Sequence, residues 1–252
     1  MAARAPTFSI LTVVRNRAET VGDALASLYA QSFADFEHVV QDGASTDGTA
    51  ELLEAVSDPR KRLISESDGG IYDALNRALA RATGQIIGLL HSDDFFAHDR
   101  VLAEVARRFD ETGADAVYGD LDYFSASDSQ RVVRHWRAGE YHPRLLARGW
   151  MPPHPALFLR RSVIERWGGY DTSYRIAADY DAVLRYFCSG ELKVAYLPAV
   201  LVKMRLGGAS NRSLGRIIRK SREDYRALRS NRVGGIGTLV YKNTRKLPQF
   251  FG

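Results

Sequence analysis

Two adjacent carboxylates, Asp93 and Asp94, follow the apolar run 85–90. Carboxylates at the end of a buried strand cost free energy unless solvent, hydrogen bonds or a cation offset their charge. Hard divalent cations such as Mg²⁺ bind one or two carboxylates and complete their coordination with phosphate oxygens and water. A cation here would neutralise the charge that develops on a departing diphosphate. The pair therefore predicts a metal site; the alternative is that both residues cap the helix near Phe95–Asp99.

A further carboxylate, Asp42, ends a second apolar run and opens the motif 42–49, which reads Asp-Gly-Ala-Ser-Thr-Asp-Gly-Thr. A carboxylate at a strand end, followed by glycine and small polar residues, can accept hydrogen bonds from the N–H groups of a nucleobase. The alternative is a turn in which side chains bind local backbone amides. We favour this capping role for Asp47 and Thr49, and ligand binding for Asp42.

The third candidate, Asp179, stands at the start of a predicted helix, where it can accept a proton from an acceptor hydroxyl in a cleft. Its alternative role is that of a structural N-cap. Asp181 is expected to hold local backbone or an arginine. Arg205 precedes the pair Gly207-Gly208, and free amides beside an arginine suit phosphate oxygens. An ordinary loop is the equally open alternative for this glycine pair.

The elements that must position these residues alternate between strand and helix up to about residue 110. The strands are predicted at 8–14, 36–41, 62–65 and 85–90, and the helices at 19–31, 46–56, 71–82 and 99–109. This alternation is typical of a parallel sheet with helices on both faces. Ligands of such sheets bind at the carboxyl ends of the strands. Asn16, Asp42 and Asp93-Asp94 are therefore expected at one edge.

Beyond Ala114 the pattern changes to short strands with fewer helices between them. Strands are predicted at 116–124, 131–137, 156–159, 194–197 and 200–204, and helices at 162–167, 180–187 and 213–230. The last twenty residues receive no assignment. We find no internal repeat, so the whole chain is expected to form one α/β unit with a helical tail.

The composition is that of a soluble protein, with 45% hydrophobic and 26% charged residues among 252. The apolar runs are too short to span a bilayer, and the N-terminus lacks the features of a secretory signal. Cys188 is the single cysteine, so no disulfide can form within the chain. These features predict a cytoplasmic protein.

The charge is unevenly distributed along the chain. From Arg205 to Gly252 there are 12 lysines and arginines against two acids, whereas the preceding residues carry 23 bases and 28 acids. A basic tail can bind anionic lipid, nucleic acid or an anionic substrate, or can be a solvated helix face. We expect residues 212–246 to dock on an anionic membrane, which would make the protein peripheral there, and we expect no nucleic-acid partner.

Taken together, these motifs resemble the inverting family 2 glycosyltransferases with the GT-A fold. The resemblance spans about residues 7–210 and is closest to the branch that builds bacterial surface and capsular polysaccharides. It rests on the opening strand and on five ordered motifs, at 42–49, 67–76, 82–94, 168–171 and 178–181. The sequence departs from the family at two positions. His91 stands where many relatives have the first Asp of an Asp-x-Asp motif, and Ala178 replaces a Glu that often precedes the base. We favour packing over metal binding for His91.

The resemblance implies an α/β fold with a Rossmann-like, mostly parallel sheet flanked by helices. Residues 7–112 would bind the nucleotide-sugar, residues 113–210 would form the acceptor side, and 211–252 would be a basic helical tail. With the motifs above, it implies a nucleotide-diphosphate sugar, preferably a UDP-sugar, and a saccharide or lipid-linked acceptor. Mg²⁺ or Mn²⁺ would bind Asp93 and Asp94, and Asp179 would be the general base. The donor-binding residues expected are Thr12, Asn16, Asp42, Asp68, Asp73, Asn76, Ser92 and Arg205.

Two other classes of function fit the sequence less well. A metal-dependent nucleotidyltransferase needs a glycine-rich loop with a lysine after the first strand, and residues 12–20 contain neither residue type. A non-catalytic nucleotide-sugar-binding module would tolerate loss of the acidic residues, but Asp93, Asp94 and Asp179 are all present.

Overall fold

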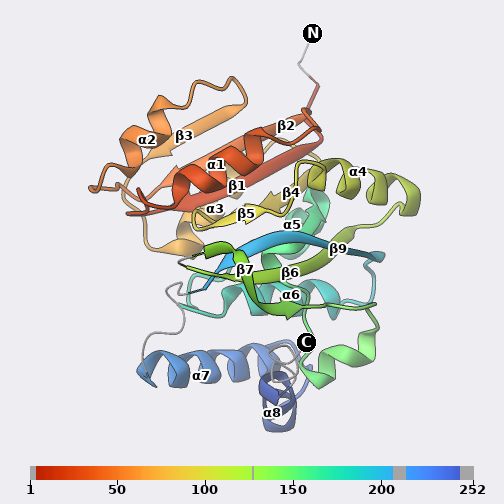
Figure 1. The fold of residues 1–252 in the computed structure, drawn as a ribbon. Coiled ribbons are helices and arrows are strands. Elements are labelled where there is room, and N and C mark those ends of the chain that lie inside the picture. Colours follow the sequence, from red (N-terminus) through yellow and green to blue (C-terminus); the bar gives the residue numbers. More distant parts are fainter. Residues whose placement is uncertain (1–3, 127, 207–213, 245–252) are drawn as a thin grey trace.

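The computed structural model describes residues 4–126, 128–206 and 214–244 (Figure 1). Four parallel strands form the N-terminal half of its sheet, in the order β3-β2-β1-β4. Their bounds are Phe8–Val14 for β1, Phe36–Asp42 for β2, Lys61–Ser65 for β3 and Ile86–Leu89 for β4. Strands β1, β2 and β4 are buried at every position, as expected of strands covered on both faces, and β2 also buries the polar residues Glu37, His38 and Gln41.

Helices cover both faces of these strands, as the alternation predicts. Helix α3 (Ile71–Arg81) packs on the face that carries Leu11 and Val13. Helices α1 (Val21–Tyr29) and α4 (Val101–Thr112) pack on the opposite face, against Phe8 and Ile10. Helix α2 (Thr49–Ala55) joins that second face through Leu53.

The C-terminal half of the sheet is mixed, so the parallel arrangement holds for only part of it. The strands β8 (Leu157–Arg160), β6 (Ala116–Ser125), β9 (Val194–Arg205) and β5 (Asp94–Phe96) follow β4 in that order, and β7 (Asp128–Trp136) pairs with β6. Only β6 and β9 run parallel here; β4 with β8, β8 with β6, and β9 with β5 are antiparallel. Helices α5 (Arg161–Trp167) and α6 (Ala178–Phe187) cover this half.

Several predicted boundaries were wrong for identifiable reasons. Helix α2 does not begin at Thr46, because Gly48 adopts a φ of 94°, which a right-handed helix excludes. Asp94 begins a strand rather than capping a helix, and α4 starts after Arg100 instead of Asp99. The two strands predicted around Pro198 are one strand, β9, whose register with β6 shifts opposite the proline. Such a bulge accommodates a residue without an N–H group.

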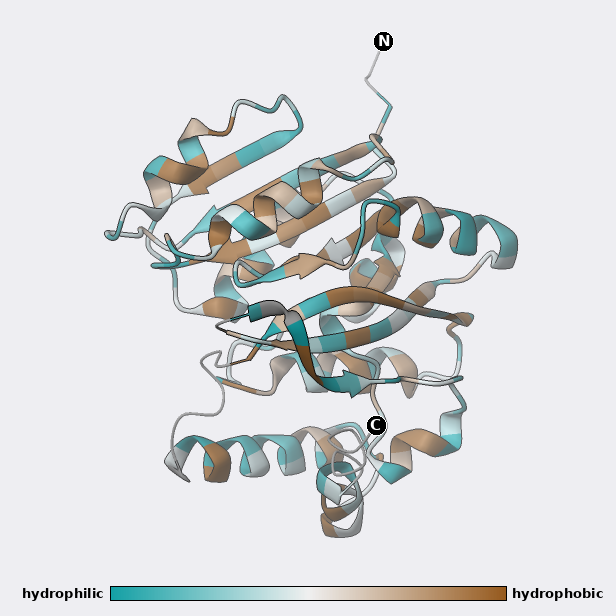
Figure 2. Cartoon of the chain, viewed as in Figure 1, coloured by the Kyte–Doolittle hydropathy of each residue, from teal (hydrophilic) through white to brown (hydrophobic). Residues whose placement is uncertain are grey.

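Two helices follow the sheet and lie below it in Figure 1. Helix α7 (Leu214–Ser230) packs on α6, close to the predicted bounds, and α8 (Ile236–Thr244) packs on α7 and on the short 3₁₀ helix η1 (Pro143–Arg148). Figure 2 shows hydrophobic and hydrophilic residues interspersed along both helices. In the described part of the chain no helix combines the length and hydropathy that a membrane span requires.

Candidate active site

The acidic pair lies where the short loop after β4 enters β5: Asp93 is the last loop residue and Asp94 the first residue of β5. Leu90 fixes the start of this loop, because its N–H donates to Leu11 and its carbonyl accepts a hydrogen bond of 2.8 Å from the Thr12 hydroxyl. Asp94 is buried, and its Oδ1 accepts the backbone N–H of Arg205 at 3.3 Å. Its Oδ2 is buried with no hydrogen-bond partner in the described part of the chain. Burial and the charge of Asp93 raise the pKa of Asp94.

This arrangement fits a divalent cation. The orphaned Asp94 oxygen lacks a partner, and the adjacent Asp93 carboxylate, half-buried, receives no hydrogen bond from the residues described. A cation would supply the missing partner and offset the repulsion between the two charges. No group of three or more His, Cys, Asp or Glu among the described residues could hold a metal ion. The remaining ligands of a cation at this pair would be phosphate oxygens and water.

Asp179 is the second residue of α6 and is held by side chains from two other elements. Its Oδ2 lies 3.2 Å from Nδ1 of His154, in the 3₁₀ helix η2 (His154–Ala156). Its Oδ1 accepts from the Tyr72 hydroxyl of α3 at 3.3 Å. Burial, with the charge of Asp179, raises the pKa of Tyr72, so its hydroxyl remains a donor. The Asp179 side chain is 23% exposed, which leaves it accessible to a substrate hydroxyl.

A pair of histidines connects Asp179 to the acidic loop. Nε2 of His154 lies 3.2 Å from Nε2 of His91. Burial, followed by the charge of His154, lowers the pKa of His91 to about 4, while the charges of both Asp93 and Asp179 act on the same ring in the opposite direction. A neutral His91 that donates from Nε2 leaves His154 with its proton on Nδ1, facing Asp179. The cation-binding candidates and the base candidate thus share one centre.

Sequence reasoning missed His154 and gave His91 only a packing role. The two rings are 63 residues apart in the chain and come from a strand end and a 3₁₀ helix. Neither periodicity nor spacing indicates that these rings meet. The departure at His91 from the family's acidic motif was the one signal at this point of the sequence.

Three expected donor-binding residues lie in or just after β1 and β2. Thr12 and Asp42 are buried, with 1% and 0% exposed. Asp42 accepts from the Ser45 amide at 3.0 Å and from the Ser65 hydroxyl at 2.6 Å. Asn16, which is exposed and has a φ of 53°, accepts the amide of Thr46 at 2.9 Å and so ties the two loops together.

The expected donor-binding residues around α3 also contact backbone. Asp68 accepts the Gly70 amide at 2.8 Å, and Asp73 accepts the Gly69 amide at 2.8 Å. That last hydrogen bond lowers the pKa of Asp73. A Cβ atom on Gly43 would lie only 2.8 Å from Oδ2 of Asp68, so a side chain at this position would require the Asp68 carboxylate to move.

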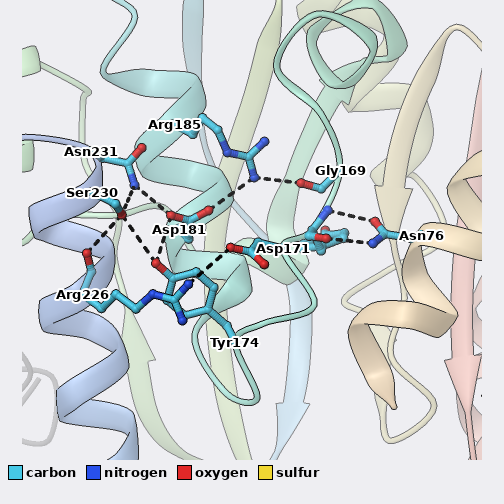
Figure 3. Close-up of a pocket in the computed structure, with 10 residues that line it drawn as sticks. Asn76, Gly169, Asp171, Tyr174, Asp181, Arg185, Arg226, Ser230 and Asn231 are labelled. Carbon is cyan, nitrogen blue, oxygen red and sulfur yellow. Dashed lines mark hydrogen bonds and ion pairs between the residues drawn. The ribbon is translucent and has the colours of Figure 1, made fainter. Parts of the chain in front are cut away.

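Asn76 lies on a different surface of α3, at a cavity of about 510 Å³ bounded by α3, α6, α7 and the segment 169–174 (Figure 3). Its side-chain amide donates to the Tyr170 carbonyl at 2.7 Å and accepts the Tyr170 amide at 2.8 Å. Asp181 faces the same cavity, 3.4 Å from Arg185, which confirms the expected contact with an arginine. The polar groups of this cavity largely bind one another.

The last two expected residues adjoin the acidic pair. Ser92 is buried with 6% exposed. The Arg205 guanidinium donates to Asp23 at 2.8 Å and to the Ala126 carbonyl at 3.2 Å, and it stacks over the Phe124 ring. The Gly207-Gly208 pair lies outside the described residues. The structure thus brings Ser92, Asp93, Asp94 and Arg205 together, whereas Asn76 lies apart.

Comparison with known proteins identifies the family of the chain. Residues 9–168 match the family described as Glycosyl transferase family 2. A PGL/p-HBAD biosynthesis glycosyltransferase of Mycobacterium bovis (strain BCG / Pasteur 1173P2) is 34% identical over 212 residues, which cover 82% of this chain and 80% of that protein.

Two solved structures share the fold at low sequence identity. S. aureus TarS 1–349 in complex with UDP-GlcNAc has a TM-score of 0.70 at 18% identity, with 90% of this chain and 66% of that chain covered. The mannosyltransferase PcManGT from Pyrobaculum calidifontis, in complex with GDP-Man and Mn²⁺, has a TM-score of 0.68 at 21% identity, with 98% and 74% covered. These similarities establish the GT-A fold.

Proposed function

This chain belongs to glycosyl transferase family 2, and from that premise we propose that it transfers a sugar from a nucleotide-diphosphate donor to an acceptor hydroxyl, with inversion at the anomeric carbon. The observation that carries the proposal is the single centre that joins the acidic pair, through His91 and His154, to Asp179. Membership of the family leaves no support for a nucleotidyltransferase or a non-catalytic module. In this proposal residues 7–112 bind the donor and residues 113–210 form the acceptor side.

The donor is proposed to be a UDP-sugar bound with Mg²⁺ or Mn²⁺. Proteins of the same fold hold UDP-GlcNAc in one case and GDP-Man with Mn²⁺ in another. Asp93 and Asp94 would hold the cation, which supplies positive charge to the departing diphosphate. Arg205 and Ser92 stand beside this pair. Asn16, Asp42, Asp68 and Asp73 shape the loops proposed to receive the nucleotide, and direct contacts from Thr12 and Asn76 remain predictions.

The proton transfer is assigned to Asp179. Its Oδ2 is oriented by His154 and its Oδ1 by Tyr72, so the partly exposed carboxylate can take the proton of an acceptor hydroxyl that binds beside it. The freed oxygen then forms a bond to the anomeric carbon as the bond to the diphosphate breaks on the opposite face. Holding both partners in this alignment is the main contribution of the chain's own residues.

The first experiment measures nucleotide-sugar binding and product stereochemistry together. We expect a UDP-sugar with Mn²⁺ to raise the unfolding free energy by about 2.7 kcal/mol at a hundredfold excess over Kd, and excess EDTA or Asp93→Asn to abolish the increase. Nuclear magnetic resonance of the product should show the inverted anomer. Equal donor binding in excess EDTA would contradict the role of the acidic pair, and a retained anomeric configuration would contradict the single displacement.

The acceptor is proposed to be a saccharide or a lipid-linked saccharide at the surface of an anionic membrane. Helices α7 and α8 expose apolar side chains that are each more than half accessible, namely Ile217, Ile218, Ile236, Val240 and Tyr241. Exposed arginines such as Arg219 and Arg222 accompany them on α7. Apolar groups among cations suit an anionic lipid surface, where each basic residue contributes about 1 kcal/mol. This placement would make the enzyme peripheral on the cytoplasmic side of the membrane.

Cosedimentation with vesicles tests the membrane proposal. We expect the protein to sediment with vesicles that contain phosphatidylglycerol, to do so less at high salt, and not to sediment with pure phosphatidylcholine. The double variant Arg219→Glu/Arg222→Glu should lose binding while it keeps transferase activity on a soluble acceptor. Undiminished binding of this variant would contradict the proposal.

A further inference from the structure

The start of α6 receives its hydrogen-bond acceptor from another helix. Ala177, the residue before α6, offers no side-chain cap. The backbone N–H groups of Arg175, Ile176 and Ala177 instead all donate to one carboxylate oxygen of Glu223, at 3.1, 2.8 and 3.0 Å. Glu223 belongs to α7 and is 47 residues from Ile176. Three successive amides on one anionic oxygen form a concave anion-binding arrangement.

The segment held by Glu223 also contacts the residues around Asp179. The carbonyl of Ile176 accepts the Tyr72 hydroxyl at 2.6 Å, and the same hydroxyl reaches Oδ1 of Asp179 at 3.3 Å. Residue 176 is therefore held on its N–H side by α7 and on its carbonyl side by α3. The position of Asp179, three residues further on, depends on both.

We propose that Glu223 is a positioning residue for Asp179, an inference that rests on the proposed role of Asp179 as the base. Hydrogen bonds to a charged acceptor are the stronger ones, and a carboxylate near a helix N-terminus is favoured by the helix dipole. Without the carboxylate, three neighbouring amides lose their partner and the first turn of α6 loosens. A small displacement of a reacting group is enough to slow a reaction that requires alignment.

The position of Glu223 is itself fixed by a buried ion cluster on the same helix. Asp224, with its side chain 2% exposed, pairs with Lys220 at 2.7 Å and with Lys242 of α8 at 2.9 Å. Nζ of Lys242 also lies 3.0 Å from the centre of the Tyr180 ring on α6. Helices α6, α7 and α8 thus meet next to the base. The basic C-terminal helices therefore pack, through α7, on the helix that carries Asp179.

Glu223→Ala tests the inference, with Glu223→Gln and the exposed Arg229→Ala as comparisons on the same helix. We expect Glu223→Ala to lower kcat for transfer by about 10- to 100-fold, with the KM for the nucleotide-sugar changed less than twofold. Amide hydrogen exchange at residues 175–177 should become faster. Glu223→Gln keeps an acceptor oxygen, so its kcat should lie between those of Glu223→Ala and the unmodified protein. The kcat of Arg229→Ala should match that of the unmodified protein.

The outcomes separate this inference from the proposed function. An unchanged kcat in Glu223→Ala overturns it, whether or not amide exchange at 175–177 becomes faster. So does a loss of activity in which kcat falls, KM rises and the thermal midpoint drops together, since that describes general destabilisation. If Asp179→Asn retains turnover, the assigned base is wrong irrespective of Glu223. If Asp179→Asn is inactive and Glu223→Ala is fully active, only the positioning role fails.

Discussion

The loops after β1 and β2 and the centre around Asp94 both collect carboxylates, but the chain treats them differently. Around those loops the carboxylates accept hydrogen bonds from nearby residues, as Asp42 at the end of β2 does from Ser45 and Ser65, and Asp73 in α3 does from Gly69. At the centre, one oxygen of Asp94 is buried without a hydrogen-bond partner in the described chain, next to a second carboxylate.

The difference separates carboxylates that hold backbone from carboxylates that await a ligand. Hydrogen-bond donors already neutralise much of the charge in the first group, so removing such a carboxylate loosens a loop. In the second group the described chain gives Asp94 one backbone donor, from Arg205, and leaves its buried Oδ2 without a partner, which a ligand from outside could supply. Asp42 therefore acts first on the shape of the nucleotide loops, and its direct contact with a nucleobase stays a prediction.

The largest expected effect is that of Asp179→Asn. The amide cannot take a proton from the acceptor hydroxyl, so kcat for transfer should fall by about 10²- to 10⁴-fold, the usual contribution of a general base. Binding of the nucleotide-sugar should be unchanged, because the side chain meets the acceptor. A radiolabelled product assay with a parallel donor titration measures both. Asp171→Asn, at an exposed position, is the control, and comparable activity of the two variants would remove Asp179 from this role.

The variants Asp42→Asn and Asp94→Asn test the distinction between a carboxylate that is fully hydrogen-bonded and one that has an oxygen without a partner. The first change places an amide against two serine donors and should lower the unfolding free energy by about 1–3 kcal/mol. The second mimics a protonated acid at a site whose pKa burial already raises, so the metal-free protein should be as stable as before or more stable. Thermal unfolding with and without Mn²⁺ and UDP-sugar measures this, and only Asp94→Asn should lose the ligand-dependent stabilisation. Equal destabilisation by the two changes would abolish the distinction.

His154→Ala should have a smaller effect, lowering kcat by about 10-fold because Asp179 loses the group that orients it. His154→Asn restores an N–H donor near the position of Nδ1 but cannot reach His91, so it should recover part of the loss. Steady-state kinetics of both variants, with the KM for donor and acceptor determined separately, distinguish orientation from binding. Identical kcat values for the two variants would show that the contact between Nδ1 and Asp179 contributes nothing.

The parts of the fold that sequence predicted are those set by local patterns. The strands β1 and β4 are short apolar runs, and β2 ends in the polar residue Asp42, so these strands and the position of the acidic pair follow from neighbouring residues. The mixed order of the C-terminal strands does not follow, because β8 inserts between β4 and β6 from far along the chain. Helix α8 was not assigned because glycines precede and interrupt it.

For the site, too, sequence predicts only what local patterns determine. Asp93, Asp94 and Asp179 were identified by residue type at strand and helix ends, which is local information. Glu223 and His154 act across 47 and 63 residues, on segments whose approach only the folded chain defines. Ser45 lies three residues from Asp42, so a local turn predicts its hydrogen bond, whereas no local pattern predicts the hydrogen bond from Ser65. Sequence therefore indicates which residues carry the chemistry better than which residues hold them in place.

The smallest expected effect concerns His38. Unlike the carboxylates compared above, this buried side chain is hydrogen-bonded in its neutral form. The ring is 0% exposed and bonds the Tyr29 hydroxyl at 2.7 Å and the Thr12 hydroxyl at 2.9 Å. Burial, then the charge of Lys61, lowers its pKa to about 3, from about 6.5 in the unfolded chain. As the pH falls below about 6.5 the unfolded chain binds a proton that the folded chain excludes, so stability declines by about 1 kcal/mol per pH unit.

His38→Gln keeps a donor and an acceptor but cannot be charged. The unfolding free energy of this variant should therefore decline less steeply with falling pH than that of the unmodified protein. Urea unfolding between pH 7 and pH 4 measures the two slopes, and the values at pH 7 account for any difference in packing. Because the comparison is between slopes, a uniform loss of stability does not affect it. If the two slopes coincide, His38 is protonated in the folded chain, and the neutral network beneath the nucleotide loops is not as described.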